Sequence, residues 1–205
     1  MQNLKGLYVI ADAACIGEDS IINKTEEVLT AGVKIIQYRD KVNSLDDRYK
    51  IAEELRRLTH DHECLLLIND DAQLAQSIEA DGVHLGKEDG SIKLARKLLG
   101  DDKIIGASCY AQFENAQATI NASADYIAFG SFFPSETKPN APRAEIALIA
   151  KTKQQFNIPV CAIGGITPQN ATKVLKAGAD MIAVISAVFN ASSPKRAVQE
   201  YLSLI

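Results

Sequence analysis

The chain has 205 residues, of which 47% are hydrophobic and 23% charged, and its formal net charge is −4 at pH 7. This length suffices to bury roughly 70% of the unfolded surface around one core, so we expect residues 1–205 to form a single domain. The longest basic run is the pair Arg56-Arg57, which disfavours broad nucleic-acid binding. The apolar run 7–10 is too short for a signal peptide, and no stretch approaches the roughly 20 apolar residues of a membrane helix. We therefore expect a cytoplasmic protein without a membrane partner.

Short apolar, β-branched runs alternate with longer amphipathic segments along the whole chain. The predicted strands are 7–11, 33–39, 64–69, 82–86, 103–108, 126–130, 160–163 and 181–186. The predicted helices are 21–31, 45–60, 71–79, 91–99, 113–121, 145–155, 168–177 and 194–204. Within the second helix, Ser44 and Asp47 form a candidate capping box. Five apolar residues at helical spacing predict its buried face: Leu45, Tyr49, Ala52, Leu55 and Leu58.

A faint internal repeat marks the places where helices end and strands begin. It reads "LTAGVKII", "IEADGVHL" and "LKAGADMIAVI", each with a small residue and a glycine where a helix must stop. Eight strands alternating with eight helices predict a compact (β/α)8 TIM barrel of the α/β class. The alternative is an open, doubly wound sheet, but the first strand-to-helix junction, "IADAACIGEDS", lacks a G-x-G-x-x-G fingerprint.

The four cysteines and three histidines suggest little chemistry. Cys15, Cys64, Cys109 and Cys161 are far apart and include no Cys-x-x-Cys pair, so we expect reduced, mostly buried thiols. We expect His60 and His62 to be surface residues, and His84, which lies inside a strand, to be a packed or hydrogen-bonded core residue. No Ser/His/Asp or Cys/His arrangement follows from the spacing.

Polar residues gather where the predicted strands end, which in this architecture is the working face of the barrel. They are Gln37, Arg39 and Lys41, then Asn69, Asp70 and Asp71, then Lys87, Glu88 and Asp89, and further on Ser108, the loop "PSETK", Gly164-Gly165 and Ser186. The opposite, N-terminal ends of the strands show no comparable set. We therefore expect the chemistry at the C-terminal ends.

The stretch "IIQYRDK", residues 35–41, ends a core strand in three charged residues. Alternation along a strand places Gln37, Arg39 and Lys41 on one face, and Tyr38 and Asp40 on the other. The two cations are about 6.6 Å apart, and their repulsion is about 2.5 kcal/mol at an effective dielectric constant of about 20. Either the strand end splays into water or an anion lies between the cations.

Two carboxylates from adjacent strand ends, Asp70 and Asp89, are candidate ligands of a divalent cation. Mg²⁺ takes one or two protein carboxylates and completes its octahedron with phosphate oxygens and water. The alternative is that Asp70 or Asp71 caps the following helix and that Asp89 is a turn residue.

Two further segments are candidate phosphate sites. The proline-rich loop "FFPSETKPNAP" carries Ser135, Thr137 and Lys138, a set that suits a phosphate clamp or, alternatively, a solvated connector. The glycine pair in "AIGGITPQN" and the Ile185-Ser186 pair in "AVISAVF" follow the last two strands, where backbone N–H groups commonly bind phosphate. The residues alone thus predict a magnesium-dependent enzyme with a pyrophosphate subsite and a monophosphate subsite.

Seven motifs in order resemble the thiamine-phosphate synthase family, from Leu7 to Phe189. They are "QYRDK" (37–41), "IND" (68–70), "DGVHLGKED" (81–89), "IGAS" (105–108), "SETKP" (135–139), "AIGGI" (162–166) and "VIS" (184–186). The resemblance implies that a hydroxymethylpyrimidine diphosphate loses pyrophosphate and is joined to the nitrogen of a thiazole phosphate, giving thiamine phosphate. It also implies a dissociative substitution assisted by one Mg²⁺ per subunit.

The resemblance also assigns residues to roles. It implies catalytic roles for Arg39, Lys41, Ser108 and Lys138, and magnesium ligation by Asp70 and Asp89. It implies pyrimidine diphosphate binding by Gln37, Tyr38, Arg39, Asp40, Lys41, Asn69, Ser108 and Lys138. It implies thiazole phosphate binding by Ser135, Glu136, Thr137, Gly165, Ile185 and Ser186. For Asp40, alternation along the strand favours orienting the cations over touching the ligand through its side chain.

Three positions depart from the commonest pattern of that family. Ala11 and Ser135 stand where threonine is usual or frequent, and Tyr110 stands where many members have histidine. The last departure weighs against the nearest rival, a thiazole tautomerase of the same superfamily whose proton-shuttling histidine falls at this position. A second rival is a non-catalytic phosphate-ligand sensor. The sequence leaves open whether the thiazole substrate is carboxylated and whether the protein is a homo-oligomer.

Overall fold

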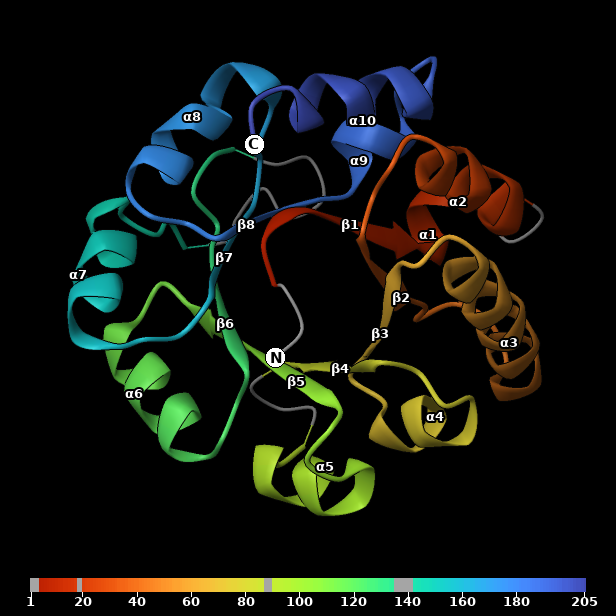
Figure 1. Cartoon of the computed structure of the whole chain (residues 1–205), viewed down its shortest axis with the longest axis horizontal. Coiled ribbons are helices and arrows are strands. Elements are labelled where there is room, and N and C mark those ends of the chain that lie inside the picture. The colour runs from red at the N-terminus through yellow and green to blue at the C-terminus, as the bar shows by residue number, and fades with distance from the viewer. Residues whose placement is uncertain (1–3, 18–19, 87–89, 135–141) are drawn as a thin grey trace.

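The strands form a closed parallel barrel, in a computed structural model that describes residues 4–17, 20–86, 90–134 and 142–205. Each strand is hydrogen-bonded to the next in chain order, and β8 returns to β1 (Figure 1). The pairing of Gly6–Val9 with Met181–Val184 closes the sheet. This closure confirms the predicted (β/α)8 TIM barrel and shows that the open doubly wound alternative is wrong.

The observed strands lie close to the predicted ones. They are β1 Gly6–Asp12, β2 Ile35–Arg39, β3 Leu65–Asn69, β4 Gly82–Leu85, β5 Ile104–Tyr110, β6 Tyr126–Phe129, β7 Val160–Ile163 and β8 Met181–Val184. The helices among the described residues are α1 Ala13–Ile16, α2 Ile21–Thr30, α3 Leu45–Asp61, α4 Ala72–Ser77, α5 Ile92–Leu99, α6 Phe113–Asn121, α7 Ala147–Gln155, α8 Pro168–Lys176, α9 Ser186–Phe189 and α10 Pro194–Leu202. They surround the strands as an outer ring (Figure 1). None of them is long and apolar enough to cross a membrane.

The eighth strand ends earlier than predicted. Strand β8 stops at Val184, and Ser186 is the first residue of the short helix α9. The backbone leaves the extended region at Ile185, where ψ is −92°. Ser186 therefore begins a helical turn, whose first N–H groups lack intrahelical partners.

Apolar side chains form two layers, one inside the barrel and one between barrel and helices. Alternation along β2 shows the division, because Ile35 belongs to the interior cluster and Ile36 and Tyr38 to the outer one. The predicted face alternation of β2 is thereby confirmed. Cys64, Cys109 and Cys161 are buried, and all four cysteines are free thiols, as predicted.

Helix α3 buries a shorter apolar face than its spacing predicted. Ala52, Leu55 and Leu58 are buried, but Leu45 is 75% exposed and Tyr49 is 37% exposed. The first part of α3 therefore does not contribute to the core. At its start, the Ser44 hydroxyl accepts the Asp47 N–H at 3.2 Å, which confirms one half of the predicted capping box.

A repeated ion pair lies at the N-terminal ends of the strands, where the sequence indicated no comparable polar set. An aspartate stands directly before β4, β6 and β8. Each accepts a hydrogen bond from a backbone N–H of the previous strand and one from a cation of the helix before that strand. The sets are Asp81 with Leu66 and Arg56 (2.8 and 2.8 Å), Asp125 with Ile105 and Arg96 (2.7 and 2.6 Å), and Asp180 with Val160 and Lys153 (2.8 and 2.8 Å).

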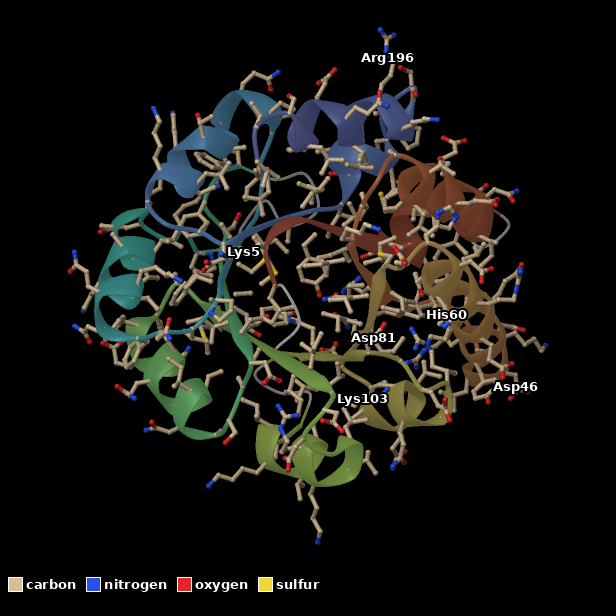
Figure 2. All side chains as sticks on the ribbon, in the orientation of Figure 1. Lys5, Asp46, His60, Asp81, Lys103 and Arg196 are labelled. Carbon is tan, nitrogen blue, oxygen red and sulfur yellow. The ribbon has the colours of Figure 1, made fainter. Side chains whose placement is uncertain are left out.

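These pairs differ from the charges on the outer surface. Figure 2 shows Asp81 beside the strands, whereas Arg196 projects outward from α10. The side chain of His60, in the last turn of α3, is 77% exposed, which confirms that it is a surface residue. The expectation that the N-terminal ends lack a polar set was wrong, because an aspartate lies one residue before each of β4, β6 and β8.

Candidate active site

The end of β2 places two cations at the mouth of the barrel, each paired with a carboxylate of a flanking strand. Arg39 Nη1 is 2.6 Å from Asp12 Oδ2 at the end of β1, and Lys41 Nζ is 2.7 Å from Asp70 Oδ2 just after β3. Neither of the two expectations from the sequence, splaying into water or an anion between the cations, is needed to offset their repulsion. The two carboxylates already do so.

Tyr38 and Asp40 lie on the other side of β2, away from the interior. Both are buried, and the Asp40 carboxylate accepts the Tyr38 hydroxyl at 2.7 Å and the N–H groups of Val42 and Asn43 at 3.0 Å. Burial alone would raise the pKa of Asp40, but these hydrogen bonds outweigh it and lower the pKa below its ordinary value. The two side chains therefore hold the β2–α3 loop. Their predicted contact with a substrate gains no support from this position.

Asp70 and Asp71 are adjacent in the chain but have different partners. Asp71 caps α4, since its Oδ1 accepts the Leu74 N–H at 2.8 Å. Asp70 has a left-handed backbone (φ 63°) and accepts the Gly86 N–H at 3.2 Å and the Asn69 amide at 2.6 Å. Of the two residues that the sequence offered as caps, only Asp71 is one. Asp70 is the carboxylate left for a ligand at the mouth.

The Asp70 carboxylate suits a hard cation. Burial would raise its pKa, but the hydrogen bond and charge of Lys41, with the Gly86 N–H and the Asn69 amide, lower the pKa below its ordinary value. An ionised carboxylate is a ligand that Mg²⁺ binds readily. Among the described residues no three His, Cys, Asp or Glu side chains gather as a metal site, and the second predicted ligand, Asp89, lies outside them.

A chain of hydrogen bonds crosses the barrel interior from β2 to β5. Its members, in order, are Gln37, Tyr8, Tyr126, His84 and Ser108, with successive polar atoms 2.6, 3.0, 2.8 and 2.9 Å apart. Both ends, Gln37 and Ser108, are predicted to bind the pyrimidine diphosphate. The chain confirms that His84 is a hydrogen-bonded core residue.

Burial keeps the middle of this chain uncharged at neutral pH. It lowers the pKa of His84 to about 4 and raises the pKa values of Tyr8 and Tyr126 above that of a free tyrosine. The Tyr126 ring stacks on His84, with centroids 5.5 Å apart. It fits because Gly106 on β5 has no side chain, and a Cβ there would collide with the Tyr126 ring.

The loop after β7 packs tightly against the segment after β6. Gly164 and Gly165 both have positive φ, and a Cβ at Gly165 would collide with the Pro134 carbonyl. The Gly164 carbonyl accepts the Phe133 N–H at 2.9 Å. Packing between these loops thus explains the glycine pair, in addition to the predicted approach of a phosphate. The predicted residues Ser135, Glu136, Thr137 and Lys138 lie outside the described residues.

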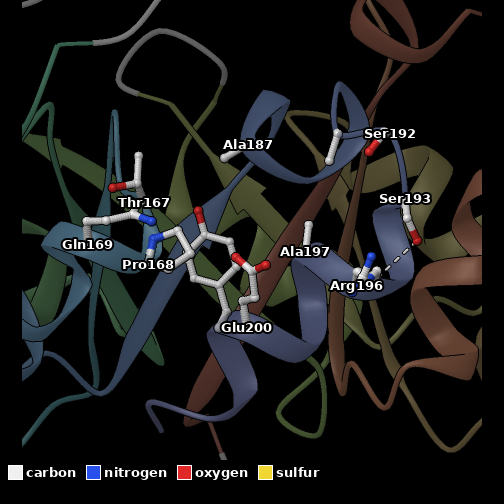
Figure 3. Close-up of a pocket in the computed structure, with 11 residues that line it drawn as sticks. Thr167, Pro168, Gln169, Ala187, Ser192, Ser193, Arg196, Ala197 and Glu200 are labelled. Atoms are coloured by element: carbon white, nitrogen blue, oxygen red, sulfur yellow. Dashed lines mark hydrogen bonds between the residues drawn. The ribbon is translucent and has the colours of Figure 1, made fainter.

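Two cavities open near the strand ends. One, of about 440 Å³, is lined by Lys41, Asp70 and Gly90 together with residues of α4 and α5, and so adjoins the predicted metal site. The other, of about 390 Å³, lies between α8 and α10 and is lined by Thr167, Arg196 and Glu200 among others (Figure 3). None of the described residues that line the second cavity is a predicted site residue.

Sequence reasoning missed the carboxylate that holds Arg39 and the residues that link Gln37 to Ser108. Asp12 directly follows the predicted first strand, 7–11, and ends the observed β1, so it could have been found as one more polar strand end. No sequence feature distinguishes Tyr8 and Tyr126, because each lies at an ordinary position within an apolar strand segment. Only closure of the barrel brings β1, β6 and β4 together in the interior.

Comparisons with known proteins agree on one family. Residues 7–188 match the family model described as thiamine monophosphate synthase. Thiamine-phosphate synthase from Nitrosococcus oceani is 46% identical over 97% of this chain and 92% of its own, and that from Azoarcus is 42% identical over 99% and 98%.

A solved structure of thiamine phosphate pyrophosphorylase from Pyrococcus furiosus superimposes with a TM-score of 0.88 and 37% identity, covering 98% of this chain and 96% of that one. A structure named KGPDC, from Streptococcus mutans, shares only the fold, at 16% identity and a TM-score of 0.78 over 98% of this chain and 97% of its own. By sequence and by structure, this chain belongs to the thiamine monophosphate synthase family.

Proposed function

We propose that this chain is a thiamine-phosphate synthase, a transferase that joins a hydroxymethylpyrimidine diphosphate to a thiazole phosphate and releases pyrophosphate. The observation that carries the proposal is the array at the mouth of the barrel. Arg39 and Lys41 lie at and just after the end of β2, each within 2.7 Å of a carboxylate, and the barrel interior carries the Gln37 amide on β2 and the Ser108 hydroxyl on β5. Family membership supports the same reaction.

The cations act on the leaving group. As the bond between the methylene carbon and the diphosphate oxygen breaks, negative charge grows on the diphosphate, and Arg39 and Lys41 stabilise it. Lys41 can turn from Asp70 to the diphosphate because its side chain is 48% exposed. The positive charge left on the aminopyrimidine is shared by its ring, and the thiazole nitrogen then forms the new bond. This division of charge requires no strong general base.

Asp70 is proposed to hold the magnesium ion, with Asp89 as second ligand, at one ion per subunit. When bound, Mg²⁺ supplies positive charge to the departing pyrophosphate. Lys138 is proposed to bind the same diphosphate, and Asn69 orients Asp70 through the hydrogen bond at 2.6 Å. The lowered pKa of Asp70 supports this assignment, since the carboxylate is ionised where the metal is needed.

The thiazole phosphate is proposed to bind at Gly165, Ile185 and Ser186, together with the loop residues Ser135, Glu136 and Thr137. The N–H groups that open α9 supply donors for a phosphate dianion. Whether the thiazole carries a carboxylate does not alter this subsite.

The whole chain, residues 1–205, is proposed to act as one catalytic domain in the cytoplasm. The barrel runs from Gly6 to Val184, and α10 packs back against α2 and β1, so the last helix completes the ring. The net charge of −4 supports small phosphorylated substrates as partners over nucleic acid.

The decisive experiment mixes the purified protein with both substrates and Mg²⁺ and follows thiamine phosphate and pyrophosphate. Both products are expected, and a chelator should suppress them. Conversion of a thiazole phosphate tautomer without condensation would point to the isomerase, and binding without turnover to a sensor. Either result would overturn the proposal.

A further inference from the structure

The hydrogen-bond chain inside the barrel has a definite direction. The Gln37 side-chain nitrogen Nε2 is the atom nearest the Tyr8 hydroxyl, at 2.6 Å, and an amide nitrogen can only donate. Tyr8 therefore accepts from Gln37, and its own proton is left for Tyr126, 3.0 Å away, an arrangement in which Tyr8 is the donor of a pair where either hydroxyl can donate. In the same arrangement the Tyr126 proton is left for His84 Nδ1, 2.8 Å away, and the imidazole is the tautomer that accepts there.

This direction fixes the protonation pattern of His84 and the orientation of Ser108. A neutral imidazole that accepts at Nδ1 carries its proton on Nε2, and so it donates to Ser108 Oγ, 2.9 Å away. The Ser108 proton is then free to point at a ligand. At the other end, the Gln37 nitrogen is engaged, so its oxygen Oε1 is the atom left to accept. The barrel interior thus presents one fixed acceptor and one fixed donor.

We propose that Tyr8, Tyr126 and His84 are positioning residues that set Gln37 as a hydrogen-bond acceptor and Ser108 as a donor for the aminopyrimidine diphosphate. The inference rests on the proposed function for the identity of that substrate. Its amino group donates to Gln37, and Ser108 donates to a lone pair of the ring or the diphosphate. An acceptor at the amino group stabilises the positive charge that grows on the ring as the diphosphate leaves.

The chain is suited to this task because none of its middle members can readily turn or ionise. Tyr8 and Tyr126 are at most 1% exposed, and His84 is 8% exposed. Breaking any link leaves a buried hydroxyl or ring nitrogen without a partner, which makes the alternative orientations costly. Gln37 and Ser108 are thus held in place before the substrate arrives.

The first test is spectroscopic and independent of activity. NMR of ¹⁵N-labelled wild-type protein at neutral pH distinguishes the protonated from the unprotonated ring nitrogen of His84. The proton is expected on Nε2, with Nδ1 unprotonated. A proton on Nδ1 would mean that the chain runs in the opposite direction, and would overturn the proposal even if the protein is an active synthase.

The second test removes single hydroxyls. Tyr126→Phe and Tyr8→Phe are each expected to lower kcat/KM for the pyrimidine diphosphate by about 10- to 100-fold. KM for the thiazole phosphate should stay within about twofold, since the hydrogen bonds of the chain involve none of the described residues proposed for that subsite. In Tyr126→Phe the proton of His84 should also distribute over both ring nitrogens. If one of the two variants fails to fold, the activity of the other still tests the proposal.

The matched control is Tyr201→Phe. Tyr201 is equally buried, and its hydroxyl donates to the Ile166 carbonyl at 2.9 Å, in the layer between barrel and helices. The control should lose stability comparable to that lost by the other two variants but retain its activity. If Tyr8→Phe and Tyr126→Phe are also as active as the wild type, the chain only packs the core and the proposal is wrong. An inactive wild-type protein would instead refute the proposed function.

Discussion

The two ends of the barrel use charged residues in different ways. At the N-terminal end, Asp81, Asp125 and Asp180 each tie a helix cation to a backbone N–H inside the sheet. At the C-terminal end both cations come from the end of one strand and reach carboxylates of two others. The first arrangement joins a helix, the strand that follows it and the start of the next strand. The second leaves the two cations partly exposed, at 29% and 48%, where an anion can reach them, so that fold stability and the proposed catalysis depend on opposite ends.

The largest effect is expected from Asp70→Asn at the mouth. The change removes the charge proposed for magnesium, so kcat/KM should fall by at least about 1,000-fold. Asparagine tolerates the left-handed backbone at φ 63°, so the melting temperature should change little. Steady-state kinetics and thermal unfolding measure the two effects.

Asp71→Asn is the matched control for that variant. Asparagine is a good N-cap, so α4 should keep its start and the enzyme most of its activity. A fully active Asp70→Asn protein would remove Asp70 from the site, and an equal loss in both variants would show a general effect of charge in this cavity.

At the opposite end, Asp180→Ala should affect stability and leave catalysis intact. It strips the Val160 N–H and the Lys153 ammonium of their shared partner, which should lower the free energy of unfolding by about 3 kcal/mol. Urea unfolding measures the loss, and kcat well below the melting temperature should match the wild type. A large fall in kcat would contradict the separation of the two ends.

The interior between the two ends should respond to pH through His84. Its pKa is lowered by burial from 6.5 to about 4, so the unfolded state binds the proton more tightly than the folded state. The stabilisation is fully present above pH 6.5 and is lost progressively as the pH falls towards 4, by about 3 kcal/mol in all. Urea unfolding across this range should show the slope, and His84→Gln should flatten it. An equal slope in both proteins would assign the effect to other groups.

The smallest effect is expected from Lys153→Met. This change removes the cation but keeps the hydrogen bond from the Val160 N–H to Asp180, so the free energy of unfolding should fall by about 1 kcal/mol. Urea unfolding of this variant and of Asp180→Ala separates two contributions to the free energy of unfolding. One comes from the hydrogen bond between Asp180 and the Val160 N–H, and the other from the ion pair between Asp180 and Lys153. A loss as large as that of Asp180→Ala would assign the stabilisation to the cation.

The sequence predicted what depends on local periodicity. It identified the barrel and the faces of β2, because alternation and helix spacing are local properties of the chain. It left open whether Asp70 or Asp71 caps the following helix, since the answer depends on a left-handed backbone at Asp70 that no spacing reveals. Two further points depend on how separate elements meet in the fold. For that reason the sequence analysis missed Asp12 as the partner of Arg39 and wrongly predicted that Leu45 is buried.

The empty position at Gly106 has a consequence for protein engineering. The ring of Tyr126 on β6 occupies the space that a side chain on β5 would fill, so the two residues behave as one unit shared between neighbouring strands. Grafting the hydrogen-bonded interior onto another barrel therefore requires the glycine to be transferred together with the tyrosine. A scaffold with alanine at that position would push the ring aside and separate His84 from Tyr8 before any polar contact could form.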